Sequence, residues 1–206
     1  MMQDGDSLFD LVEIMRQKAP EYMALLTAHS EAEFDKAFDA MLEKAVLRLE
    51  QNSKNFAALD EVGLSGCLAA SLSMPGLSVI QEANSNGHVD ITIDADHCVP
   101  ARRKLGEAKI YKGPEYHVQG LGQLLQRYTT GREGRGLLIV YVRAKDISGL
   151  IKKIRQKMDD EHPCDQQGKT VDHTIRWSFL SSHAHSCGDV LDVSHIGCNL
   201  YSAPAG

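Results

Sequence analysis

The hydrophobic positions of the first 51 residues follow a helical pattern. Apolar residues recur at intervals of three and four between residues 7 and 28, with an interruption near Pro20. A stronger run covers residues 31–51, where the apolar positions are Phe34, Phe38, Met41, Leu42, Ala45, Val46 and Leu49. Such spacing places these side chains on one face of an α-helix. The sequence therefore predicts a helical hairpin extension over residues 1–55, followed by a domain over residues 56–206.

Beyond a polar joint, the pattern changes from helix to strand. Residues 60–72 form one more predicted helix, which ends before Pro75. Strands are predicted over residues 77–82, 88–95 and 105–111, with a turn over residues 96–104. The strand over 88–95 alternates most clearly, because its apolar side chains point to one face and Asp90, Thr92 and Asp94 to the other.

Helices and strands alternate through the rest of the chain. Helices are predicted over residues 116–129 and 146–158, a polar loop over 159–172, and strands over 137–142, 175–181 and 190–200. The run over 137–142 is apolar throughout, which is typical of a strand buried on both faces. This order predicts an α/β fold in which helices sandwich a mixed sheet.

Charge is unevenly distributed along a chain whose formal net charge is -6. Residues 1–61 carry 13 acidic and 6 basic side chains, whereas residues 101–157 carry 14 basic and 4 acidic ones. The acidic helical hairpin thus precedes a basic segment that indicates a local site for a polyanion. Lys and Arg on solvated helix faces would give the same counts.

The sequence also bears on location and redox state. It contains no apolar run of the roughly 20 residues needed to span a bilayer, and its acidic N-terminus differs from a secretory signal. The five cysteines include no CxxC pair, which argues against a disulfide framework or a zinc ribbon. We therefore expect a cytoplasmic protein with reduced thiols and no membrane partner.

The candidate chemistry lies on two neighbouring predicted strands. Glu107 and Lys109 point the same way because strand side chains alternate, and Asp90 lies on the polar face of the preceding strand. Two converging carboxylates can bind Mg²⁺ through oxygen, and the metal can activate a water for attack on a phosphodiester. A solvated strand face carrying a Glu–Lys pair is the simpler alternative.

Three segments resemble motifs of the PD-(D/E)XK, or restriction-endonuclease-like, nuclease superfamily: Asn86–Ile91, Gly106–Ile110 and Gln123–Tyr128. The resemblance covers about residues 60–145. It implies a restriction-endonuclease-like mixed-sheet sandwich with an α-β-β-β-α-β core. The chain departs from the pattern in two places: Val89 stands where a proline is common, and the Gln-to-Tyr spacing is one residue longer than in the branch of the superfamily that it resembles.

The resemblance implies roles for individual residues as well. Asp90 and Glu107 would hold Mg²⁺ or Mn²⁺, and Lys109 would assist the attacking water. Asp94 is an alternative to Asp90, or it pairs with a nearby arginine across the predicted turn.

Two further residues are implied by the same resemblance. Glu61, from the helix before the first strand, would be an additional metal ligand, although a carboxylate in a first helical turn also stabilises the helix dipole. Gln123 would support the catalytic site from the helix that follows Lys109, with Gln119 as the second choice.

Nucleic-acid contacts are expected from basic residues on both sides of this constellation: Arg102, Arg103, Lys112, Arg127, Arg132 and Arg135. The glycine- and arginine-rich segment 131–136 is expected to connect a helix to a strand. It therefore differs from a P-loop, whose glycines lie between a strand and the following helix.

These features predict a Mg²⁺-dependent hydrolase, an endonuclease or exonuclease that acts on DNA in preference to RNA. By resemblance, such small nucleases act in restriction, repair or phage-defence systems. The alternative is a catalytically silent nucleic-acid-binding or interaction protein with the same fold. The acidic N-terminal helices offer a surface for a homodimer or for a partner protein.

Overall fold

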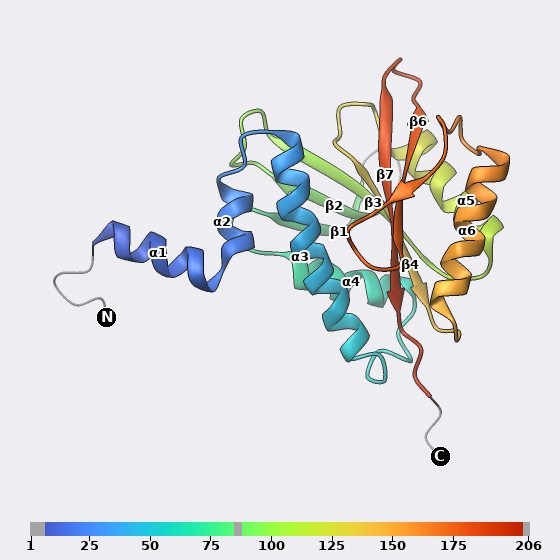
Figure 1. Ribbon diagram of the computed structural model, residues 1–206, viewed down its shortest axis with the longest axis horizontal. Coiled ribbons are helices and arrows are strands. Elements are labelled where there is room, and N and C mark those ends of the chain that lie inside the picture. The colour runs from blue at the N-terminus through green and yellow to red at the C-terminus, as the bar shows by residue number, and fades with distance from the viewer. Residues whose placement is uncertain (1–6, 85–87, 204–206) are drawn as a thin grey trace.

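One mixed β-sheet with helices on both faces organises the molecule (Figure 1). This computed structural model describes residues 7–84 and 88–203. Within these residues the strands are β1 (Ser78–Asn84), β2 (His88–Ala95), β3 (Arg102–Ile110), β4 (Gly136–Val142), β5 (Val171–Asp172), β6 (Ser178–Ala184) and β7 (Val190–Asn199). Their spatial order is β1-β2-β3-β4-β7-β6-β5. Strand β4 is parallel to both neighbours and the other pairs are antiparallel, so the predicted α/β class with a mixed sheet is confirmed.

The described part of the chain contains six α-helices: α1 (Leu8–Lys18), α2 (Pro20–Leu26), α3 (Glu31–Gln51), α4 (Glu61–Leu72), α5 (Pro114–Gln123) and α6 (Ile147–Glu161). A short π-helix, Leu124–Tyr128, continues α5. Ser7, Ser30, Asp60 and Asp146 begin four of the helices, and each accepts a hydrogen bond from the backbone amide three residues ahead. None of the described helices is long and apolar enough to cross a membrane.

Strand β4 separates two hydrophobic cores. Every residue of β4 is buried, and the side chains from Leu137 onward alternate between the two faces of the sheet. One face packs with α3 and α4, and the other packs with α5 and α6. The prediction that residues 137–142 form a strand buried on both faces is confirmed.

The start of β3 differs from the prediction. Strand β3 begins at Arg102, inside the segment predicted as a turn over residues 96–104. Arg103 lies directly opposite Asp94 in the antiparallel ladder, and its Nε lies 2.6 Å from the Asp94 carboxylate. This cross-strand ion pair stabilises the pairing of β2 with the first residues of β3. Strand β3 therefore begins three residues earlier than the strand predicted over residues 105–111.

Two later segments also differ from the prediction. Strand β5 pairs with β6 inside the predicted polar loop over residues 159–172, because Val171 and Asp172 lie opposite Leu180 and Phe179. The helix predicted over residues 116–129 begins earlier, at Pro114, and its last turn is π-helical. By contrast, the helical interruption near Pro20 is confirmed, since α1 ends at Lys18 and α2 begins at Pro20.

Helix α3 shares a hydrophobic core with the sheet. Phe34, Phe38 and Leu42 are buried in the same core as Ala108 of β3 and Ile139 of β4. The predicted boundary between an extension over residues 1–55 and a domain over residues 56–206 stays a prediction. The packing of α3 nevertheless makes the helix part of the support beneath the central strands.

Ion pairs reinforce this contact. An acidic row on α3, formed by Glu31, Asp35 and Asp39, follows the four-residue spacing of one helix face. Arg102 Nε lies 3.1 Å from Glu31, Lys104 contacts Asp35, and Arg135 contacts Asp39. The Lys104 side chain is only 1% exposed. A charge that is buried this deeply needs its partner, so the acidic row fixes α3 against the sheet.

Removing the Phe38 side chain is expected to destabilise the whole fold. The Phe38→Ala substitution empties a fully buried position and should lower the free energy of unfolding by about 3–5 kcal/mol. Urea denaturation followed by far-UV circular dichroism and by Trp177 fluorescence measures this change. Leu47→Ala, on the same helix but at a 46% exposed position, is the control and should cost less than about 1 kcal/mol. Separate transitions for the two signals would show that α3 unfolds independently of the sheet.

Candidate active site

Strands β2 and β3 pair over only part of their length. Their ladder runs from Ala95 opposite Arg102 to Ile91 opposite Gly106, and beyond Gly106 strand β3 continues along β4. The two strands separate there, so the residues of β3 after Gly106 lie outside the β2–β3 ladder. Buried backbone amides without an acceptor cost free energy, so this end of β3 needs other acceptors.

Two carboxylates supply them. The Ala108 amide donates to Asp90 Oδ2 at 2.8 Å, and the Ile110 amide donates to Glu61 Oε2 at 2.7 Å. Asp90 comes from β2, and Glu61 comes from the first turn of α4. The hydrogen bonds therefore fix carboxylates from two elements beside the same stretch of β3.

Glu107 and Lys109 project from β3 beside these carboxylates. Their side chains form an ion pair, with Glu107 2% exposed and Lys109 12% exposed. Lys109 Nζ also lies 3.6 Å from Glu61 Oε1. The structure thus brings together Asp90, Glu107, Lys109 and Glu61, which we call the carboxylate–lysine cluster.

Burial sets the protonation equilibria of this cluster. It raises the pKa of Glu107 to about 7, and the negative charges of Asp90 and Glu61 act in the same direction against the hydrogen bond from Lys109. Burial disfavours the Lys109 ammonium, but its hydrogen bond to Glu107 and the surrounding carboxylates raise the Lys109 pKa overall. The cluster holds more negative than positive charge when its carboxylates are ionised, and a bound cation would relieve that excess.

The oxygen atoms present fit the chemistry of a hard divalent cation. Glu107 Oε2 is buried without a hydrogen-bond partner, and carboxylate oxygens are the ligands that Mg²⁺ prefers. No three acidic, histidine or cysteine side chains within residues 7–84 and 88–203 already stand around a point that suits a metal ion. Glu107 contacts Lys109 instead, so a cation would compete with the ammonium for this carboxylate.

Helix α5 covers the cluster with Gly120, which sequence reasoning missed, and with Tyr116. A Cβ atom added at Gly120 would lie 3.1 Å from Lys109 Cγ and 3.2 Å from a methyl group of Leu138. Tyr116, one turn earlier, places its ring centroid 5.9 Å from Lys109 Nζ. A glycine inside a helix lowers helix stability, and this was the available signal that Gly120 serves a close approach.

The π-helix affects how Gln123 and Tyr128 are related. The Thr129 amide donates to the Leu124 carbonyl at 3.2 Å, a bond that spans five residues. In such a turn, side chains five apart stack as those four apart do in an α-helix. Gln123 and Tyr128 are therefore brought toward the same side of the helix.

Both residues have buried polar groups. Gln123 Oε1 is buried without a hydrogen-bond partner, whereas the alternative residue, Gln119, is exposed. Burial raises the pKa of Tyr128, and the charges of Glu107 and Asp90 raise it further. The Tyr128 phenol therefore lies within electrostatic reach of the cluster.

The basic residues predicted to contact nucleic acid divide into two sets. Arg102 and Arg135 face the acidic row of α3, with side chains that are 9% and 12% exposed. The others are exposed at the surface: Arg103, Lys112, Arg127 and Arg132. Arg103 pairs with Asp94, as one of the two readings of Asp94 predicted. Lys112 lies 4.7 Å from the Tyr116 ring centroid and is therefore near the cluster.

No family model, curated protein or solved structure matches this chain. The resemblance to the PD-(D/E)XK nucleases therefore stays a prediction that rests on the residues named above. The chemistry of the cluster is interpreted below from its own geometry.

A second buried polar network lies beneath α5. His117 Nε2 is 2.7 Å from His195 Nδ1, and Ser181 Oγ is 2.7 Å from both His195 Nε2 and His183 Nε2. His183 Nδ1 lies 2.9 Å from the Cys164 carbonyl oxygen. The network links α5, β7 and β6 through side chains alone.

These hydrogen bonds define one direction of donation. The Cys164 carbonyl can only accept, so neutral His183 donates from Nδ1 and accepts at Nε2 from the Ser181 hydroxyl. Ser181 then accepts from His195, and His195 accepts from His117. His117 Nδ1 is left as a buried acceptor without a partner, which agrees with three neutral rings.

Acid is expected to destabilise the protein through this network. Burial lowers the pKa of His117 to about 3 and lowers the pKa of His195 and His183. Below pH 6.5 the unfolded chain binds protons at these histidines, whereas the native imidazole rings stay neutral. The free energy of unfolding therefore decreases as the pH falls from 6.5 toward 3.

Replacing one ring tests this linkage. His117→Phe should reduce the slope of the unfolding free energy between pH 3 and 6.5 by about one proton, or at most about 1.36 kcal/mol per pH unit. Chemical denaturation at several pH values measures the slope. Glu107 contributes the opposite slope between pH 4.5 and about 7, but it does so in both proteins and cancels in the difference. The control, Gln119→Ala at an exposed position without an ionisable group, should keep the original slope. A His117 variant that also keeps it would contradict neutral buried histidines.

Proposed function

We propose that this protein is a metal-dependent nuclease that hydrolyses phosphodiester bonds of DNA. The observation that carries the proposal is the meeting of Asp90, Glu107 and Lys109 where β2 and β3 part, with Glu61 at the same place. Asp, Glu and Lys side chains in one buried cluster are the residue types that metal-assisted hydrolysis requires.

The surrounding topology supports a restriction-endonuclease-like assignment. The elements from α4 to β4 follow the order helix, three strands, helix, strand, with β4 parallel to β3. The Gln-to-Tyr spacing is one residue too long for the resembling motif, and the π-helix compensates for that extra residue. Both features favour the PD-(D/E)XK interpretation over an unrelated strand with a Glu–Lys pair.

The residues of the cluster would have different roles in hydrolysis. Asp90, Glu107 and Glu61 would hold Mg²⁺ or Mn²⁺ through carboxylate oxygens. A metal ion held there would supply Lewis-acid chemistry, polarising the phosphate and making water a better nucleophile. Lys109, once separated from Glu107, is placed to orient the attacking water or to offset charge that develops on the phosphate oxygens. Gln123 and Tyr128 support this arrangement from the helix above.

Electrostatics explain why a cation belongs to this function. Three carboxylates beside one ammonium would repel an approaching phosphodiester, because like charges at close range raise the free energy of the complex. A divalent cation would cancel this excess of negative charge, since the ionised cluster has a net charge of -2. Exposed Lys112, Arg127 and Arg132 are then available for backbone phosphates, which position DNA without reading its sequence.

Cleavage assays test the proposal directly. Supercoiled plasmid, linear duplex DNA and RNA are incubated with Mg²⁺, Mn²⁺ or EDTA. We expect metal-dependent cutting of DNA, and Asp90→Asn, Glu107→Gln and Lys109→Met should each reduce its rate roughly 100-fold or more, since each removes several kcal/mol of transition-state stabilisation. Gln119→Ala, an exposed glutamine on α5, is the matched control and should cut normally. Equal cutting by all variants would overturn the proposed site.

Metal binding provides a readout that is independent of turnover. Calorimetric titration with Mn²⁺ should detect one site in the unaltered protein and lose it in the Asp90→Asn protein, while Gln119→Ala retains it. Metal binding without cleavage of any substrate would favour the alternative of a silent binding protein with this fold. Absence of binding would remove the basis for metal-assisted hydrolysis.

A further inference from the structure

Helix α1 presents an apolar surface that its own chain leaves uncovered. It projects from the body of the molecule (Figure 1), and none of its residues is buried. Leu8 is 77% exposed and Phe9 is 69% exposed, and Leu11 and Ile14 are exposed as well. Four large apolar side chains on eleven residues exceed the scattered exposure that is usual on a protein surface.

A helix of this length needs a partner surface. Isolated helices shorter than about 12–15 residues are marginal in water, and the capping box between Ser7 and Asp10 satisfies only the first turn. Packing of the apolar face is therefore the remaining source of stability for α1.

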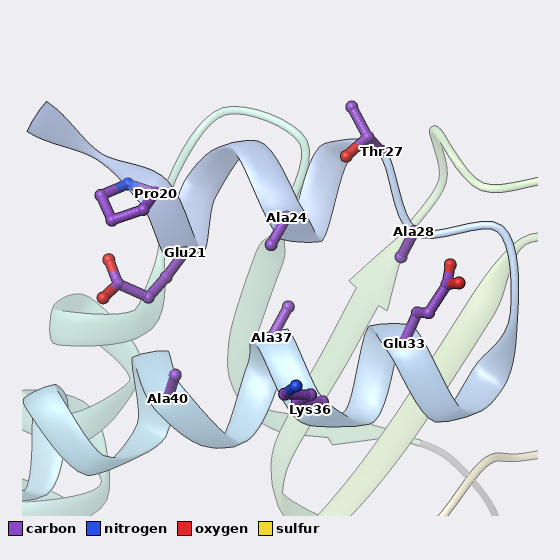
Figure 2. Close-up of a pocket in the computed structure, with 9 residues that line it drawn as sticks. All are labelled: Pro20, Glu21, Ala24, Thr27, Ala28, Glu33, Lys36, Ala37 and Ala40. Carbon is purple, nitrogen blue, oxygen red and sulfur yellow. The ribbon is translucent and has the colours of Figure 1, made fainter. Parts of the chain in front are cut away.

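A suitable surface exists on the neighbouring helices. A groove of about 450 Å³ lies between α2 and α3. Figure 2 shows the side chains that line it, among which the small ones are Ala24, Ala28, Ala37 and Ala40. Small residues let a third helix approach at the 8–10 Å axial distance of close packing. At 1.5 Å per residue α1 is about 16 Å long, which is longer than the seven-residue helix α2 that forms one wall of the groove.

The connection between α1 and α2 prevents α1 from entering the groove of its own chain. Ala19 alone separates the two helices, and it bonds to both: its amide donates to Met15, and its carbonyl accepts from Met23. Antiparallel helix pairs use connections of about 2–5 residues. One residue is too short for α1 to fold back along α2.

We propose that α1 of one copy occupies the α2–α3 groove of a second copy, and that the exchange is reciprocal in a two-fold symmetric dimer. Such an interface uses the same two surfaces on both subunits and closes on itself. This inference is independent of the nuclease proposal.

Charge complementarity favours a second copy as the occupant. The rim of the groove carries Glu21, Glu33 and Lys36, and on α1 the helical spacing places Arg16 and Lys18 on either side of Leu8 and Leu11. Arg16 and Lys18 can face the glutamates of the rim, in exchange for the ion pairs that Arg16 forms with Glu13 and that Glu21 forms with Lys44 within one chain. Glutamates on both surfaces would disfavour an anionic lipid surface or a nucleic acid.

Light scattering after size exclusion tests the assembly state of the full chain. We expect a dimer at micromolar concentration, and Phe9→Glu should weaken the dimer about 30-fold or more, as loss of a central apolar anchor does. Val99→Glu, at a 97% exposed position outside both surfaces, is the control and should leave the dimer intact. A monomer at all concentrations would overturn the proposal, and so would a dimer that Phe9→Glu leaves unchanged.

Disulfide trapping identifies the contact within the dimer. Leu11→Cys and Ala24→Cys are placed in separate proteins, both carrying Cys187→Ser because Cys187 is exposed, and the proteins are mixed under mild oxidation. A covalent dimer should form in the mixture and exceed the yield from either protein alone, while Val99→Cys in place of Ala24→Cys should give none. Cross-linking of the Leu11→Cys protein to itself alone would place α1 against α1 and overturn the groove. Binding of monomeric protein to anionic vesicles that Phe9→Glu abolishes would assign α1 to a lipid surface and also overturn it.

Discussion

Backbone amides in a sheet need acceptors, and along β3 the acceptor changes from a strand to carboxylate side chains. Strand β2 leaves the ladder after Gly106, and Asp90 and Glu61 accept from the amides of Ala108 and Ile110. The hydrogen bonds that complete the sheet are thus the same ones that aim carboxylates at Glu107 and Lys109. Fold stability and candidate chemistry depend on one set of contacts, so a change in either acceptor affects both.

Part of the basic charge of the chain stabilises the fold and is not available to a ligand. The basic segment of the sequence suggested a surface for a polyanion, but part of that charge is used inside the fold. Lys104 is almost fully buried, and Arg102 and Arg135 face the acidic row on α3. The acidic N-terminal part and the basic middle part of the chain therefore neutralise one another across the α3–sheet contact. The basic charge available to a ligand is smaller than a count along the sequence indicates, and it lies at exposed positions such as Lys112 and Arg132.

Sequence periodicity predicted the α/β class, the buried strand β4 and the shared face of Glu107 and Lys109, because these depend on local alternation. Alternation also singled out Asp90, and the resemblance to the PD-(D/E)XK nucleases implied Glu61, but neither identified the amides they bind, since those bonds arise from the separation of β2 and β3. Gly120 was missed because the packing of α5 on β3 decides its neighbours. The histidine network was missed for a related reason: its members come from three elements, and no spacing along the chain connects them.

The π-helix after α5 separates two quantities that are usually treated as one, the number of residues between two side chains and their distance around the helix. One additional residue is absorbed in the turn Leu124–Tyr128, so Tyr128 keeps the side of the helix that a shorter, purely α-helical segment would give it. Counted in residues alone, the spacing from Gln123 to Tyr128 is one residue longer than in the motif that this segment resembles. The geometry of the turn cancels the difference, so one inserted residue at this point need not change the surface above β3.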